Sequence, residues 1–107
     1  MPINRFNQIV YSQIQALKDN PEALIQFFKT LGRNETYGFK NQISIYHHRP
    51  EGRAFANIEF WQKQNYTFKK GQIVGVPMLV KDSRGNIFIK NYFDMTQTEP
   101  KQNKNAN

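Results

Sequence analysis

Apolar residues recur at steps of three and four in the first third of the chain, and this spacing constrains the fold more than any other feature. From Arg5 to Leu17 the apolar positions form one stripe of an amphipathic helix. Asn20 and Pro21 then supply a helix cap and a residue suited to the first helical position, and a second stripe runs on to Gly32. The two stripes are Phe6, Ile9, Val10, Ile14 and Leu17, then Leu24, Phe27, Phe28 and Leu31. We expect two short helices packed on each other.

A third helix is expected from Tyr37 to about His48, because Phe39, Ile43 and Tyr46 fall on one stripe. The segment from Arg49 to Arg53 then contains Pro and Gly, which interrupt the helical pattern. We expect this segment to be a turn that carries two arginines.

The middle of the chain predicts short elements. Residues Ala54 to Ala56 are expected to form a short strand, and Ile58 to Gln64, centred on Trp61, a short helix. The sequence Lys69 to Gly71 is typical of a turn and leads into a β-rich run.

The last ordered elements are expected to be the strands of a hairpin. Pro77 lies in the β-rich run and favours an edge strand or a bulge, since proline has no N–H to donate to a neighbouring strand. The segment Asp82 to Asn86 is typical of a hairpin turn, and the returning strand is expected from Ile87 to about Tyr92. The pattern as a whole predicts an α+β fold, with N-terminal helices followed by a small antiparallel sheet that contains a β-hairpin.

The length of 107 residues has room for one domain, which we expect over residues 1–96, followed by a flexible polar tail over residues 97–107. The sequence contains no cysteine, which excludes disulfides and thiolate metal sites and favours a reducing compartment. It also lacks an apolar run long enough to span a membrane, and its first residues do not resemble a secretory signal. We expect a cytoplasmic location and no membrane partner.

The formal net charge of +7 is concentrated in the centre of the chain. Residues 29–90 contain eleven Lys and Arg but only four Asp and Glu, so this segment carries the whole excess. Such a distribution is typical of a face that binds a polyanion, although an ordinary solvated basic surface would have the same composition.

The sequence shows no pattern typical of a catalytic or metal site. His47 and His48 are adjacent on the predicted third helix, where side chains point about 100° apart, so they cannot hold one metal ion together without further ligands. A role at the surface or in contact with a nucleic-acid strand is favoured over metal binding. The carboxylates are scattered, and no glycine-rich phosphate loop is present. We therefore expect no enzymatic activity, no cofactor and no metal.

Aromatic and basic residues alternate between positions 46 and 70, which suits binding of an unpaired nucleic-acid strand. Bases can stack on exposed rings while Lys and Arg contact the phosphates. A small core also needs its aromatic rings, so we expect Phe39, Phe60 and Trp61 to be packed and Tyr46, Phe55 and Tyr66 to contact the ligand.

The order of these residues resembles the N-terminal domain of ArdC-type antirestriction proteins and of LtrC-like plasmid proteins. The likeness covers the chain from Arg5 to about Thr98 and depends on six landmarks in order. They are Tyr37 to Ile45, Arg49-Pro50, Phe60-Trp61, Phe68 to Gly71, Val76-Pro77 and Phe93 to Thr98. Gly38 and Gln72 depart from the pattern, because the family often has serine and glutamate at these two positions, and the connection from Lys81 to Asn86 is short.

The resemblance implies a domain that binds single-stranded DNA, of the kind found on conjugative plasmids, integrative elements and phages. In ArdC proteins a zinc metallopeptidase-like domain follows, but this sequence contains no zinc motif, so peptidase activity is not expected here. Whether the chain acts alone or as part of a longer protein stays open.

The candidate contacts come from the matched motifs and from the basic and aromatic residues around them. For Asn41 and Gln42 a role in a local hydrogen-bond network is the alternative. The candidates are Lys40, Asn41, Gln42, Tyr46, Arg49, Arg53, Trp61, Lys63, Tyr66, Lys69, Lys70 and Arg84. A module that binds a host defence protein is the alternative function, and binding of RNA or duplex DNA would use the same charges.

Overall fold

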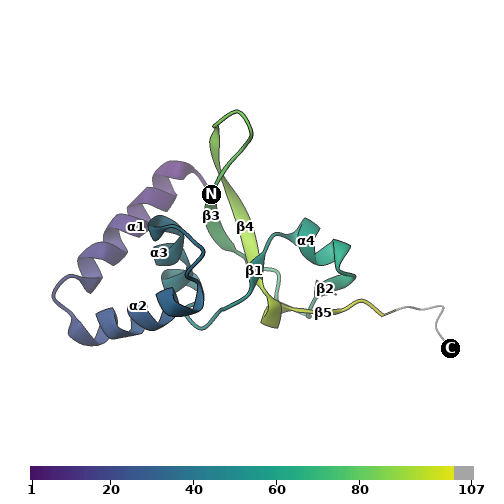
Figure 1. Cartoon of the computed structure of the whole chain (residues 1–107), viewed down its shortest axis with the longest axis horizontal. Coiled ribbons are helices and arrows are strands. Elements are labelled where there is room, and N and C mark those ends of the chain that lie inside the picture. The colour runs from purple at the N-terminus through teal and green to yellow at the C-terminus, as the bar shows by residue number, and fades with distance from the viewer. Residues whose placement is uncertain (103–107) are drawn as a thin grey trace.

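The computed structural model of the chain describes residues 1–102 and has the predicted α+β architecture (Figure 1). Three helices come first and lie together on one side of the molecule. A β-hairpin stands in the centre, and a short helix with a second small sheet lies on the other side. Residues 103–107 of the predicted tail lie outside the described residues.

The helices are α1 (Ile3–Leu17), α2 (Pro21–Arg33) and α3 (Phe39–His48). Asn20 caps α2 as expected, because its Oδ1 accepts a hydrogen bond from the Ala23 N–H at 3.1 Å. Three residues of the α1 stripe and one residue each of α2 and α3 meet in a cluster of buried side chains, whereas Leu24, Phe28 and Leu31 of the predicted α2 stripe are exposed. The cluster consists of Phe6, Val10, Leu17, Phe27 and Ile43.

The larger sheet has three antiparallel strands, with β4 (Ile87–Asp94) between β1 (Phe55–Ala56) and β3 (Val76–Lys81). The register of the β3–β4 hairpin runs from Val76 opposite Tyr92 to Lys81 opposite Ile87. Its turn is the predicted one. Gly85 adopts a φ of +84°, which glycine tolerates far better than other residues.

The outer edge of β3 is covered by α3. Asn41 Nδ2 donates to the Leu79 carbonyl at 3.0 Å, and the Leu79 N–H donates to Asn41 Oδ1 at 2.7 Å. The Ser44 hydroxyl donates to the Pro77 carbonyl at 2.5 Å. Pro77 thus lies in an edge strand, as predicted, and its missing N–H faces the helix rather than a partner strand.

A second sheet joins β2 (Tyr66–Phe68) to β5 (Thr98–Pro100) and corrects the predicted start of the tail. A short 3₁₀ helix, η1 (Met95–Gln97), precedes β5, and both Gln97 and Thr98 are buried. The polar composition of residues 97–100 predicted that burial of apolar surface would not offset the conformational entropy lost when the segment becomes ordered. Backbone pairing with β2 and a buried glutamine order this segment instead.

The short helix α4 (Ile58–Lys63) follows β1, as expected, and Asn57 Oδ1 caps it by accepting from the Phe60 N–H at 2.8 Å. No helix in residues 1–102 is long and apolar enough to cross a membrane.

Candidate nucleic-acid interface

An aromatic pocket of about 630 Å³ lies among β1, α4, β2 and β4. The pocket is open to solvent on one side, and the side-chain amide of Gln64 also lines it. Its rings are Phe55, Phe60, Trp61, Tyr66 and Tyr92. More aromatic side chains line this pocket than line the apolar groove between α1 and α2, and all but Tyr92 fall within the segment where the sequence predicted stacking platforms.

Trp61 is the fixed wall of the pocket. Its side chain is only 6% exposed, and its Nε1–H donates to the Phe93 carbonyl at 3.0 Å. The Phe60 ring lies edge-on to it with centroids 5.2 Å apart, and the Tyr66 ring lies at 5.9 Å. Trp61 is therefore packed, as expected, and offers the pocket a partial ring face rather than a free surface.

Phe60 departs from the prediction because it is 46% exposed instead of packed. It follows Ile58 and Glu59 in a helix of six residues, which is too short to bury more than one face, and Trp61 occupies that face. Phe60 is thus the most accessible ring of the pocket. The sequence signal that could have found it is the adjacency of two aromatic residues in a short helix, since both cannot face the core.

Tyr37 does not line the pocket itself, but it contacts Phe55 and Tyr92, two residues that do. Its hydroxyl donates to the Phe55 carbonyl at 2.9 Å, and its ring meets Tyr92 edge to face with centroids 6.3 Å apart. Burial raises the pKa of Tyr37, and the neighbouring Tyr92 raises it further, so the hydroxyl stays protonated and able to donate at neutral pH.

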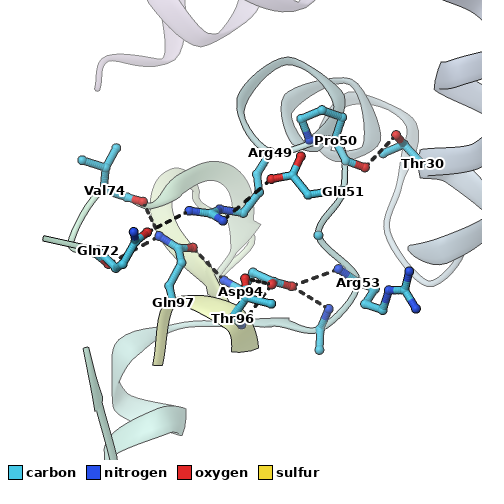
Figure 2. A network of polar contacts seen from close by, with 12 residues as sticks. Thr30, Arg49, Pro50, Glu51, Arg53, Gln72, Val74, Asp94, Thr96 and Gln97 are labelled. Atoms are coloured by element: carbon cyan, nitrogen blue, oxygen red, sulfur yellow. Dashed lines mark hydrogen bonds and ion pairs between the residues drawn. The ribbon is translucent and has the colours of Figure 1, made fainter. Parts of the chain in front are cut away.

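Four cations lie close in sequence to residues that line this pocket. Arg53 lies two residues before β1, and Figure 2 shows its guanidinium pointing away from the polar network beside it. Lys63 ends α4, and Lys69 and Lys70 follow β2. All four side chains are exposed. The segments that supply the pocket's rings therefore also carry exposed basic side chains.

The turn from Arg49 to Arg53 is tied to the end of α2. Thr30 Oγ1 and Arg33 Nη2 both donate to the Pro50 carbonyl, at 3.0 and 2.6 Å. Gly52 is buried here, and a Cβ at this position would lie 2.3 Å from the Phe55 ring. Glycine is therefore required where the turn passes the wall of the pocket.

Arg49 links this turn to the Lys69 to Gly71 turn. Its Nη2 donates to Gln72 Oε1 at 3.2 Å, and its Nη1 lies 3.8 Å from a carboxylate oxygen of Glu51. The Gln72 N–H donates in turn to the Lys69 carbonyl at 3.0 Å. Two of the predicted basic turns are thus brought together, but Arg49 is already engaged by an amide and a carboxylate (Figure 2).

Asp94 and Gln97 form the polar network that fixes these turns (Figure 2). Asp94 Oδ1 accepts from the backbone N–H groups of Arg53 and Ala54 at 2.9 and 3.0 Å. Gln97 Oε1 accepts from the Asp94 N–H at 2.9 Å, and its Nε2 donates to the Val74 carbonyl at 2.7 Å. The motif from Phe93 to Thr98 therefore has a structural role, because it links the backbone near Arg53 to the backbone near Val74. Its composition did not indicate this role.

The side-chain amides of Asn41 and Gln42 are bonded to the protein's own backbone, which corresponds to the alternative role in a hydrogen-bond network. The Asn41 amide is used by the Leu79 backbone. Gln42 is buried, and its Nε2 donates to the backbone carbonyls of Asn34 and Tyr37. Neither amide is presented at the surface as a contact for a nucleic-acid strand, because both are bonded to backbone groups that lie elsewhere in the chain.

Three other candidates lie away from the aromatic pocket. Lys40 is at the start of α3, where its Nζ lies 3.2 Å from Asn7 Oδ1. Tyr46 packs edge to face on Phe27 with centroids 5.6 Å apart, and its hydroxyl donates to the Ala23 carbonyl at 3.3 Å. Arg84 is in the hairpin turn, at the opposite end of β3 from the lysine turn. The structure does not bring these three together with the pocket.

The two histidines lie next to each other at the end of α3, with ring centroids 4.6 Å apart. In residues 1–102 no three His, Cys, Asp or Glu side chains are grouped to hold a metal ion. The pKa of His47 is lowered by burial and, to a smaller extent, by the neighbouring His48 and Arg5, which keeps its ring neutral at physiological pH.

No protein-family model, curated protein or solved structure matches the chain. The resemblance to ArdC-type proteins therefore depends on the six landmarks of the sequence alone.

Proposed function

We propose that the chain binds single-stranded DNA with little sequence preference, and that the aromatic pocket is its base-stacking site. The observation that carries this proposal is the open pocket of about 630 Å³ whose accessible ring, Phe60, belongs to a segment that also carries exposed cations. Stacking on aromatic rings tolerates every base, while lysine and arginine contact phosphates without reading sequence.

An unpaired strand fits this site better than a duplex does. The bases of a duplex are stacked on one another and cannot enter a pocket unless they are flipped out, whereas those of a single strand are free to do so. The rings of Phe60 and Tyr66 belong to α4 and β2, so one or two bases would lie between a short helix and a short sheet.

The resemblance to ArdC-type proteins suggests a biological setting for this activity. We propose that the chain shields a strand during transfer or entry of a conjugative plasmid or phage, with a role in antirestriction. This setting rests on the sequence likeness, whereas the binding activity is also supported by the pocket and its charges.

The test is fluorescence anisotropy of a labelled oligo(dT) of about 30 nucleotides, titrated at two salt concentrations against unlabelled single strand, duplex and RNA. Tight, salt-sensitive binding that duplex displaces poorly is expected. Equal displacement by duplex would replace the proposal with general nucleic-acid binding, and no binding at low salt would exclude it.

A second candidate is a module that binds a host defence protein. It is favoured by an apolar groove of about 660 Å³ between the ends of α1 and α2, where Leu24, Phe28 and Phe39 are all more than a third exposed. The partner would present an amphipathic helix with acidic flanks, because this chain carries a charge of +7. Loss of partner binding in Phe28→Lys, with DNA binding unchanged, would separate the two functions.

A further inference from the structure

The β-hairpin leaves one edge of β4 without a partner. The pairing of β1 with β4 reaches only Phe93 and Asp94, so β1 does not cover the strand from Ile87 to Tyr92. Within residues 1–102 no strand pairs with that stretch on the side away from β3, and a side-chain ion pair links the stretch to α4, between Lys90 Nζ and Glu59 Oε2 at 3.5 Å. Figure 1 shows this part of the hairpin projecting beyond α4. The open edge also carries apolar side chains, since Ile87 is 54% and Phe88 40% exposed.

The backbone groups that face this edge can be identified from the other side of the hairpin. The N–H and carbonyl of Leu79 are both bonded to Asn41, so Leu79 faces α3 rather than β4. Pairs alternate along an antiparallel ladder, and Met78 is therefore bonded to Lys90. By the same alternation the N–H and carbonyl groups of Ile87, Ile89 and Asn91 point out from the open edge.

We propose that two copies of this chain join through this edge, with their β4 strands antiparallel about a two-fold axis at Ile89. In this register Ile89 faces Ile89 and Ile87 faces Asn91, so every outward backbone group meets another outward group. The two three-stranded sheets become one continuous sheet of six strands.

The side chains select this register over its neighbours. Centred on Ile89, the pairing places Phe88 of one copy opposite Lys90 of the other, so the lysine, which is paired with Glu59 of its own chain, lies beside an aromatic ring. A pairing centred on Lys90 instead would place the two Lys90 side chains directly opposite each other, and like charges in that position are unfavourable. No other register uses all three outward residues.

A second copy, rather than a growing fibre, is the expected occupant because the opposite side of the three-stranded sheet is covered where α3 bonds to it. Asn41 and Ser44 of α3 bond to Leu79 and Pro77 on the outer edge of β3, so the three-stranded sheet does not extend there. A two-fold pairing of β4 with β4 uses the same edge in both copies, and the assembly is therefore closed. It is independent of the proposed DNA-binding function.

The test uses the absence of cysteine from the chain to trap this register with single substitutions. Residues 88 and 90 of the two copies form a non-hydrogen-bonded pair, whose Cα atoms lie about 4.5 Å apart and within reach of a disulfide. A mixture of Phe88→Cys and Lys90→Cys chains is expected to form a disulfide-linked dimer under mild oxidation, faster than either variant alone. A mixture of Ser83→Cys and Lys90→Cys is the control for random collision, since Ser83 is in the turn.

Crosslinking of the mixture no faster than that of the collision control would overturn the proposal. Faster crosslinking of Phe88→Cys with itself would overturn the Ile89-centred register. Sedimentation equilibrium of the unmodified chain supplies an independent readout. A dimer that strengthens with salt is expected, because two copies of charge +7 repel each other, and a monomer at every concentration and salt would exclude the dimer.

Discussion

Asn41 and Leu79 exchange two hydrogen bonds, as the backbones of neighbouring strands do, although one of them belongs to a helix. The amide of Asn41 both donates to and accepts from the Leu79 backbone, at 3.0 and 2.7 Å. This reciprocal pair closes the edge of β3 and fixes the direction of α3 along it. It also explains why an asparagine in the predicted interface is not available to a ligand.

Asn41→Ala should therefore lower the free energy of unfolding by about 1–3 kcal/mol, because it leaves the Leu79 N–H and carbonyl without partners. Affinity for single-stranded DNA should stay unchanged under conditions where the variant is folded. Urea unfolding and anisotropy measure the two quantities. Gln15→Ala, at an exposed position of α1, is the matched control. If Asn41→Ala lost much of its affinity for single-stranded DNA while its stability stayed unchanged, Asn41 would be a contact residue of the binding site after all.

The parts of the fold that sequence alone predicted are those encoded by neighbouring residues. The spacing of apolar residues predicted the three helices, and the turn from Asp82 to Asn86 predicted the β3–β4 hairpin. Asp82 shows why such a turn can be predicted from sequence, since its carboxylate accepts hydrogen bonds from the backbone N–H groups of Arg84 and Asn86, both at 2.9 Å. Both hydrogen-bond partners of the Asp82 carboxylate lie within four residues of it in the sequence.

The features that the sequence did not predict depend on partners far away in the chain. β5 is ordered because Tyr66 and Pro100 are opposite each other, and nothing in the composition of residues 97–100 indicates that pairing. Phe39 was expected to be packed, yet it is 56% exposed, because Phe27 fills the core where the two helices meet. Within the candidate site, the position of the lysine turn was predicted, but the ring that is accessible beside it was not.

Stability should depend on pH through Asp94. Burial alone would raise the pKa of its carboxyl, but hydrogen bonds from the Thr96 hydroxyl and from the N–H groups of Ala54, Arg53 and Thr96 hold it below its ordinary value. Because the folded pKa is depressed, this stabilisation is fully present above the unfolded pKa of about 3.9 and is lost as pH falls through the folded pKa.

Asp94→Asn should accordingly lower the free energy of unfolding at neutral pH by about 2–3 kcal/mol, and the difference from the parent chain should shrink below about pH 4. Urea unfolding at a series of pH values measures both. Glu35→Gln removes an exposed carboxylate and serves as the control. The pH profile of the variant will not be flat, since hydrogen bonds also lower the pKa of Asp82 and Glu59. A constant difference at all pH values would contradict the assignment.

Phe60→Ala should weaken binding of oligo(dT) by about 1–3 kcal/mol, which is roughly a fivefold to hundredfold rise in Kd, because it removes the accessible stacking surface. Phe28→Ala is the matched control, since Phe28 is 58% exposed but lies on α2 in the apolar groove. Trp61 is the only tryptophan and lines the pocket, so quenching of its fluorescence by DNA gives a second readout. Equal effects of the two substitutions would remove the pocket from the binding site.

The lysine turn should control the salt dependence of binding. Charge reversal of Lys69 and Lys70 together is expected to weaken binding and to flatten the log-log dependence of affinity on salt, by about 0.7 for each phosphate that the protein no longer neutralises. Reversal of Lys18 and Lys29, both exposed on the helical side, changes the net charge by the same amount and tests whether position matters. Because the structure places the first pair directly after β2 and the second pair on or beside α1 and α2, a specific interface predicts a larger change for the first. Identical slopes in the two double variants would show that the positive charge acts only through its total, and the turn would then have no place in the interface.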